Sequence, residues 1–156
     1  MGILSLMYHR FDEKKYPSTN IKMSVFEDQI QIIKDLYYNF YDPGNLEKNF
    51  DIQKKEKKIL ITIDDAFSSF YNSAWPYLKK EKIPFILFVS TESVGKIGYM
   101  TWKQIKELEK YENVYIGNHS HSHEYLVDFK KKDFIKDIKT ANNIFIKELG
   151  LSLIHI

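Results

Sequence analysis

The sequence predicts an α/β domain in which the strands of a parallel sheet are joined by helical crossovers. Short apolar runs rich in β-branched and aromatic residues alternate along the chain with stretches of helical spacing. The central run, residues 59–63, is uncharged throughout, which is typical of a strand buried on both of its faces. His9, Asp64 and His119 stand where three of these runs end. Because parallel strands share one carboxyl edge, we expect these three side chains to share that edge.

The N-terminal elements follow from local signals. Residues 3–8 are predicted as the first strand, and the polar stretch 12–22 is predicted as a loop over the active face. Apolar residues at helical spacing predict a helix over about 25–36, with Ser24 and Glu27 in the pattern of a capping box at its start.

The middle of the chain leads into and out of the central strand. A weak strand is predicted at residues 39–41, followed by a turn over 42–45 that contains Asp, Pro, Gly and Asn. The charged residues 46–57 are predicted to connect this turn to the strand at 59–63. Pro76 then indicates a helix that begins close to it, since proline is not tolerated deep inside a helix.

The second half of the chain repeats the alternation. Thr101 and Gln104 form a second capping box, and Gly150 suits the left-handed position after the last helix. The predicted elements are, in order, a strand over 85–90, a helix from Thr101 to about Lys110, a strand over 114–116 and a helix over 133–149.

Composition excludes several kinds of function. A chain of 156 residues suffices for one domain with a real core. Its net charge of +2 gives no electrostatic basis for binding nucleic acid. The absence of cysteine excludes disulfides and thiolate ligands, and no apolar run approaches the roughly 20 residues of a membrane span.

The first residues bear on the compartment. Residues 1–7 lack the basic region and the cleavage site of a secretory signal, so the chain as written is predicted to stay in the cytoplasm. An upstream segment missing from this sequence would place the protein outside the cell or in the envelope instead, and that alternative stays open.

Two adjacent carboxylates, Asp64 and Asp65, end the central strand. Neighbouring residues on a strand point to opposite sides, so these two side chains are expected to have different roles. One would hold a metal while the other faces the reacting atoms. The alternative is that they cap the following helix, because Asp favours helix starts.

Three of the five histidines fall within residues 117–123. His119 and His123 are four residues apart, a spacing at which two imidazoles can bind one ion, whereas His121 is expected to point elsewhere. A solvated histidine-rich loop is the alternative. Together with one Asp, the two histidines would make a three-ligand site with open positions, as in catalytic zinc sites, leaving the other Asp as general base for a metal-bound water.

The segment Thr62-Ile63-Asp64-Asp65 resembles the first motif of the NodB-homology polysaccharide deacetylases, carbohydrate esterase family four. His119-Ser120-x-x-His123 resembles their second motif, and residues 83–89 and 100–105 also read like the family. The resemblance implies that Asp64 is the base and that Asp65, His119 and His123 bind a divalent metal, with Zn²⁺ as the expected ion. One departure is Ala66, where the family usually has Gly.

His9 gains a role only from this resemblance. By spacing alone it is a surface histidine at the junction of a strand and a loop. Residues Leu6-Met7-Tyr8-His9-Arg10 resemble the opening of the deacetylase subgroup similar to enzymes acting on poly-β-1,6-N-acetylglucosamine, in which the motif order is permuted. That match implies that His9 is the general acid that protonates the departing amine.

The resemblance also implies a fold, a distorted (β/α) barrel of about seven strands. About five strands are predicted here, residues 151–156 would begin another, and the family's aromatic-Pro-Tyr segment does not follow. Residues 1–156 are therefore expected to form a single deacetylase domain that is incomplete at its C-terminus. His155 matches no motif and is assigned no role.

The function implied is metal-dependent removal of N-acetyl groups from an N-acetylated sugar or polysaccharide. One alternative is a hydrolase of non-sugar amides or O-acetyl esters. Another is a truncated fragment that binds metal or glycan without turnover. A phosphatase of the haloacid dehalogenase type is disfavoured, because it needs two acidic residues spaced by one and Asp64 and Asp65 are adjacent.

Overall fold

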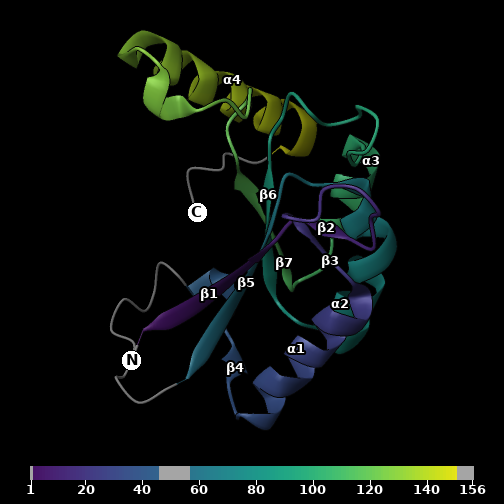
Figure 1. The fold of residues 1–156 in the computed structure, drawn as a ribbon. Helices are drawn as coiled ribbons and strands as arrows, with labels where there is room; N and C mark the ends of the chain where they lie inside the picture. The colour runs from purple at the N-terminus through teal and green to yellow at the C-terminus, as the bar shows by residue number, and fades with distance from the viewer. Residues whose placement is uncertain (1, 46–56, 151–156) are drawn as a thin grey trace.

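The computed structural model describes residues 2–45 and 57–150, and its centre is a five-stranded sheet in which every neighbouring pair of strands is parallel (Figure 1). The strand order is β1-β5-β6-β7, and β4 pairs with the first part of β5. The strands of this sheet are β1 (Ile3–Tyr8), β4 (Asn39–Phe40), β5 (Lys58–Asp64), β6 (Phe85–Val89) and β7 (Val114–Asn118). The predicted parallel sheet is confirmed.

Helices follow the strands as crossovers. The helices α1, α2 and α3 lie on one side of the sheet (Figure 1). The C-terminal part of α4 contacts α3 through an ion pair of 2.9 Å between Lys106 and Glu148. Within the described ranges, none of the helices is both long and apolar enough to cross a bilayer. The α-helices are α1 (Met23–Asp35), α2 (Trp75–Glu81), α3 (Trp102–Leu108) and α4 (Lys131–Leu149); the short helical turns are η1 (Pro43–Asn45), η2 (Phe70–Ala74), which is a π-helical turn, and η3 (Leu126–Asp128).

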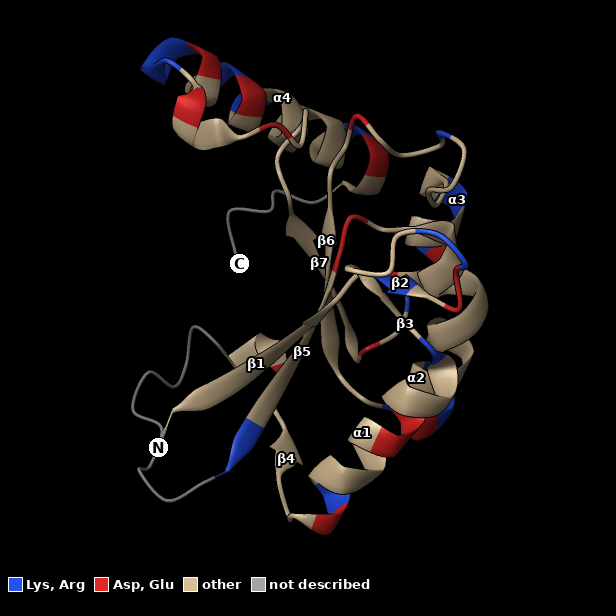
Figure 2. Cartoon of the chain, viewed as in Figure 1, with Lys and Arg blue, Asp and Glu red and all other residues tan. Residues whose placement is uncertain are grey.

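The two faces of the sheet differ in what covers them. Ile59, Ile61 and Ile63 of β5 belong to the main apolar cluster, together with residues of the helices. Side chains alternate along a strand, so Leu60, Thr62 and Asp64 lie on the other face. Figure 2 shows that β1, β6 and β7 carry no charged residue, while the helices carry many. Because one face of β5 is buried against the helices, Thr62 and Asp64 lie on the opposite face of the sheet.

Close packing on the second face explains a glycine in β7. A Cβ atom on Gly117 would lie 2.4 Å from the ring of Phe88 on the neighbouring strand. Only glycine permits this approach of β6 and β7 without a shift of the ring. The strand that delivers the histidines is thereby held close to β6.

Several local predictions were wrong in detail. The first helix begins at Met23 instead of Val25, so Ser24 lies within it and forms no cap. The first N–H of this helix instead donates to Asp12 Oδ1 at 2.9 Å, a contact from a distant part of the chain. The strand predicted at 114–116 continues to Asn118, one residue before His119.

The predicted loop over residues 12–22 also contains structure. The short strand β3 (Asn20–Ile21) pairs in parallel with β2 (Arg10–Phe11), which directly follows His9. The second capping box at Thr101 and Gln104 is confirmed by its hydrogen bonds in both directions. The predicted connection over 46–56, the additional strand at 151–156 and His155 lie outside the described residues.

Replacement of Ile61 by Ala should be costly, because this side chain is 0% exposed at the centre of the sheet. We expect a loss of about 2–5 kcal/mol in the free energy of unfolding, measured by urea denaturation. The matched control is Ile32→Ala on α1, where the side chain is 55% exposed and the expected change is within about 0.5 kcal/mol. Equal losses for the two variants would contradict the proposed placement of the core.

Candidate active site

The two carboxylates stand at a sharp bend of the backbone. Asp64 is the last residue of β5, and the next residues, Asp65 and Ala66, have φ values of +70° and +53°. Residues other than glycine rarely adopt these left-handed conformations, and they concentrate at functional sites. Ala66 stands where the deacetylase motif usually has glycine, and its positive φ gives the physical reason for that preference. The bend turns Asp65 away from the direction of the strand.

Asp65, His119 and His123 are brought together in one cluster. The distance from Asp65 Oδ1 is 2.8 Å to His123 Nε2 and 3.4 Å to His119 Nε2. One ligand atom from each residue lies within 4.8 Å of those of the other two. Two zinc ligands at tetrahedral angles are about 3.4 Å apart, so these three side chains need little movement to share an ion.

The state of the Asp65 carboxylate also fits a metal site. Its Oδ1 atom is buried and no hydrogen bond is assigned to it in the described part of the chain, although His123 Nε2 lies 2.8 Å away. A buried carboxylate oxygen without a partner is costly, and a bound cation would remove that cost. Two imidazole nitrogens and one carboxylate oxygen are a donor set suited to Zn²⁺.

Asp64 is the second carboxylate with an unpartnered buried oxygen. Its Oδ1 atom accepts no hydrogen bond from any residue that the structure describes. Burial raises the pKa of Asp64, and the imidazoles of His119, His9 and His123 act in the opposite direction. Asp64 directly precedes Asp65 in the chain, so it lies beside the cluster.

His9 lies beside Asp64 and outside the three-residue cluster. It follows β1, whose last residue, Tyr8, pairs with Ile63 directly before Asp64. The imidazole of His9 acts to lower the pKa of Asp64, against the effect of burial. Ser18 and Thr19 border the same cavity, of about 300 Å³, as His9. The three residues predicted to share one edge of the sheet, His9, Asp64 and His119, therefore lie there together with Asp65 and His123.

The loop that carries the histidines is tied to the end of β6. The N–H groups of Thr91 and Glu92 donate to the carbonyls of Ser120 and His121, at 3.2 and 3.0 Å. The imidazole of His121 is occupied by a 2.9 Å contact between Nδ1 and Thr91 Oγ1. The prediction that His121 points elsewhere agrees with this contact, which uses its side chain to fasten the loop.

Asp137 on α4 is a residue that sequence reasoning missed. Its two carboxylate oxygens accept the backbone N–H groups of His121 and Ser122, at 2.8 and 2.9 Å. Burial raises the pKa of Asp137, but these hydrogen bonds outweigh that effect and hold the pKa below its ordinary value. In the sequence, Asp137 is one polar residue in an amphipathic helix, and only its position at helical spacing from Phe134 and Ala141, on the apolar side, sets it apart.

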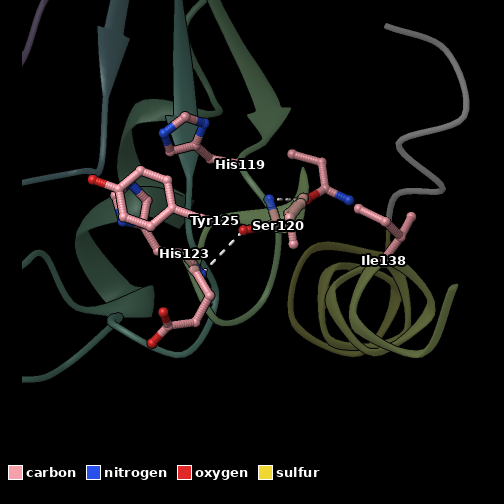
Figure 3. A pocket seen from close by; sticks show the side chains of 8 residues that line it. His119, Ser120, His123, Tyr125 and Ile138 are labelled. Carbon is pink, nitrogen blue, oxygen red and sulfur yellow. Dashed lines mark hydrogen bonds between the residues drawn. The ribbon is translucent and has the colours of Figure 1, made fainter. Parts of the chain in front are cut away.

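A cavity of about 480 Å³ borders the cluster (Figure 3). Tyr125 lines this cavity together with His119 and His123, and Figure 3 shows Ile138 on the other side of Ser120 from these rings. Tyr125 is 80% exposed. The lining residues are Asn118, His119, Ser120, His123, Glu124, Tyr125, Leu126 and Ile138. A molecule in this cavity would contact both proposed imidazole ligands.

Comparison with known proteins decides the family. Residues 51–153 match the family model described as polysaccharide deacetylase. The chain belongs to the polysaccharide deacetylase family. The poly-β-1,6-N-acetyl-D-glucosamine N-deacetylase of Staphylococcus aureus strain N315 is 30% identical over an alignment of 158 positions, gaps included. The alignment covers 95% of this chain and 52% of that protein. The chain thus spans about half the length of the curated relatives it matches.

Solved deacetylases share the fold. A Streptococcus pyogenes deacetylase, PplD, solved in complex with acetate, superposes with a TM-score of 0.81 at 26% identity, over 96% of this chain and 70% of that one. The structure of IcaB from Ammonifex degensii gives a TM-score of 0.82 at 27% identity, over 97% of this chain and 71% of that one. The sheet and helices described above therefore correspond to part of the (β/α) barrel of the family.

Asp137→Asn should destabilise the histidine loop, because an amide offers one acceptor oxygen where the carboxylate offers two. We expect a loss of about 1–3 kcal/mol in unfolding free energy at neutral pH. The depressed pKa of Asp137 stabilises the fold above the unfolded value of about 3.9, and this contribution is lost as the pH falls through the folded pKa. The difference between the two proteins, measured by denaturation from pH 7 to 3, should therefore shrink below about pH 4.

The control for this substitution is Asp133→Asn, an exposed carboxylate on the same helix. Its expected change in unfolding free energy is within about 0.5 kcal/mol. A difference between wild type and Asp137→Asn that does not vary with pH would contradict the assigned role of the carboxylate.

Proposed function

We propose that this chain removes N-acetyl groups from an N-acetylated sugar or polysaccharide by metal-assisted hydrolysis. The observation that carries the proposal is the meeting of Asp65, His119 and His123 beside Asp64, whose carboxylate oxygen is buried and unpartnered. Membership of the polysaccharide deacetylase family supports the reaction class. The name of the Staphylococcus aureus relative supports a polymer of N-acetylglucosamine as the substrate class.

Asp65, His119 and His123 would hold the metal, for which we propose Zn²⁺ because of the nitrogen and oxygen donors. When bound, a divalent ion supplies Lewis-acid chemistry, which polarises the acetamide carbonyl and lowers the pKa of water. His119 and His123 are 32% and 52% exposed in their side chains, so the open side of the cluster faces solvent and the cavity of Figure 3.

Asp64 is proposed as the general base. Asp64 directly precedes Asp65 of the cluster and makes no hydrogen bond through Oδ1 among the described residues, so its carboxylate would take a proton from the attacking water. The neighbouring carboxylate, Asp65, is directed to the imidazoles, whereas Asp64 has no such contact among the described residues. The water oxygen forms a bond to the acetyl carbon as its proton moves to Asp64.

His9 is proposed as the general acid. It comes from the other side of Asp64, at the end of β1, and its protonated imidazole would donate to the departing nitrogen. The bond between the acetyl carbon and the nitrogen then breaks. The products are acetate and a free amino group on the sugar, so each atom of water and amide is accounted for.

Asp64→Asn should abolish most of this activity, because an amide cannot take the proton. We expect turnover of a β-1,6-linked N-acetylglucosamine oligomer to fall about 10²–10⁴-fold, with free amine and acetate both quantified. The control is Asp28→Asn, an exposed position on α1 where turnover should not change. Wild-type turnover in the Asp64→Asn variant would contradict the proposed mechanism.

A further inference from the structure

An arginine next to His9 is enclosed between two aromatic rings. The guanidinium carbon of Arg10 lies 3.4 Å from the ring centre of Phe67 and 4.3 Å from that of Tyr16. The rings of Phe67 and Tyr99 are 4.8 Å apart with an interplanar angle of 36°. Tyr16, Arg10, Phe67 and Tyr99 are therefore linked by consecutive ring contacts, and we call this group the arginine column.

The guanidinium is fixed within this column. Arg10 Nη1 donates to Glu13 Oε2 at 2.8 Å, and the side chain is only 14% exposed. The backbone N–H of Arg10 donates to the carbonyl of Thr19 at 3.0 Å. A planar guanidinium can stack on two rings and hold a carboxylate in its own plane, which an ammonium group cannot do.

The column joins three loops around the proposed site. Arg10 directly follows His9, and Phe67 lies two residues after Asp65. Tyr99 belongs to the segment after β6, which is itself bound to the Asp65 loop: Met100 N–H donates to Ala66 O at 2.9 Å, and Ser68 N–H donates to Gly98 O at 2.9 Å. The arginine column thus links the loop that carries His9 to the loop that carries Asp64 and Asp65.

The alignment of His9 with Asp64 depends on such a link because the strand pairing stops before them. The last paired residues of β1 and β5 are Tyr8 and Ile63. Beyond them, the two loops are joined by the column, by a 3.3 Å hydrogen bond from Phe11 N–H to Ser69 Oγ, and by the rings of Phe11 and Phe70, whose centres are 6.0 Å apart. Phe11 is two residues from His9 and Ser69 is five residues from Asp64, whereas Arg10 is one residue from His9 and Phe67 is three residues from Asp64.

We propose that Arg10 is a positioning residue of the deacetylation reaction: its stack on Phe67 sets the distance between the acid His9 and the base Asp64. The expected loss of turnover rests on the proposed function, whereas the positioning of His9 by Arg10 does not. Misplacement of a catalytic group by about 1 Å can cost about a hundredfold in rate, so a small shift of the His9 loop is sufficient.

The kinetic test compares substitutions on both sides of the stack. Arg10→Lys keeps the charge, and Phe67→Leu keeps an apolar side chain, but each removes the flat contact. We expect kcat per folded, zinc-loaded chain to fall about 10- to 100-fold with KM within about threefold, and Phe67→Tyr, which retains the ring, to recover at least about tenfold over Phe67→Leu.

The control is Lys79→Met, which removes a cation–ring contact of 4.6 Å with Tyr111, away from the proposed site. Its kcat should equal that of wild type. An unchanged kcat in Arg10→Lys, or a Phe67→Tyr variant as impaired as Phe67→Leu, would overturn the proposal. A purely structural role would lower the melting temperature or the bound zinc while leaving kcat per folded, loaded chain unchanged.

A second readout does not depend on turnover. The imidazole ¹⁵N and ¹H resonances of His9, assigned with His9→Gln, should be single and sharp in wild type and split or broadened in Arg10→Lys. Identical His9 resonances in the two proteins would overturn the positioning role. If wild type deacetylates no substrate, the proposed function fails, and the resonances still decide whether Arg10 positions His9.

Discussion

Asp65 carries a buried carboxylate oxygen that the imidazoles of His119 and His123 approach without satisfying it. Burying a charged group without partners costs several kcal/mol, so this part of the molecule is stable only if the cost is compensated. The rest of the fold can be understood as the means of holding these atoms together. β5 brings the carboxylate to the sheet edge, and β7 brings the imidazoles to the same edge from two strands away.

Backbone strain accompanies this arrangement. Asp65, Ala66, Ser120 and His123 all have positive φ, and conformations of this kind cost of order 1 kcal/mol each. Hydrogen bonds from the surroundings offset the strain. Asp137 holds two N–H groups of the histidine loop, and Ser90 Oγ donates to the carbonyl of His119 at 2.8 Å. The ligands are thus presented by bent loops that rigid strands and one helix keep in place.

Much of the fold and of the candidate site was predictable because it follows from short-range patterns. The uncharged run of β5 predicts its burial, and the Asp and His motifs predict which residues meet. The cap of α1 by Asp12 and the anchoring of the histidine loop by Asp137 were not predictable, because both join residues that only the tertiary fold brings together. The Arg10 stack has the same character. Its members belong to three segments, and no local spacing relates them.

Metal stoichiometry of the purified chain tests the central claim most directly. Zinc is measured in wild type, in His123→Ala and in His121→Ala, where His121 is a neighbouring imidazole bound to Thr91 and outside the cluster. The account predicts about one zinc per chain in wild type and in His121→Ala, and its loss in His123→Ala. Absence of zinc from wild type, or equal zinc in all three proteins, would contradict the proposed site.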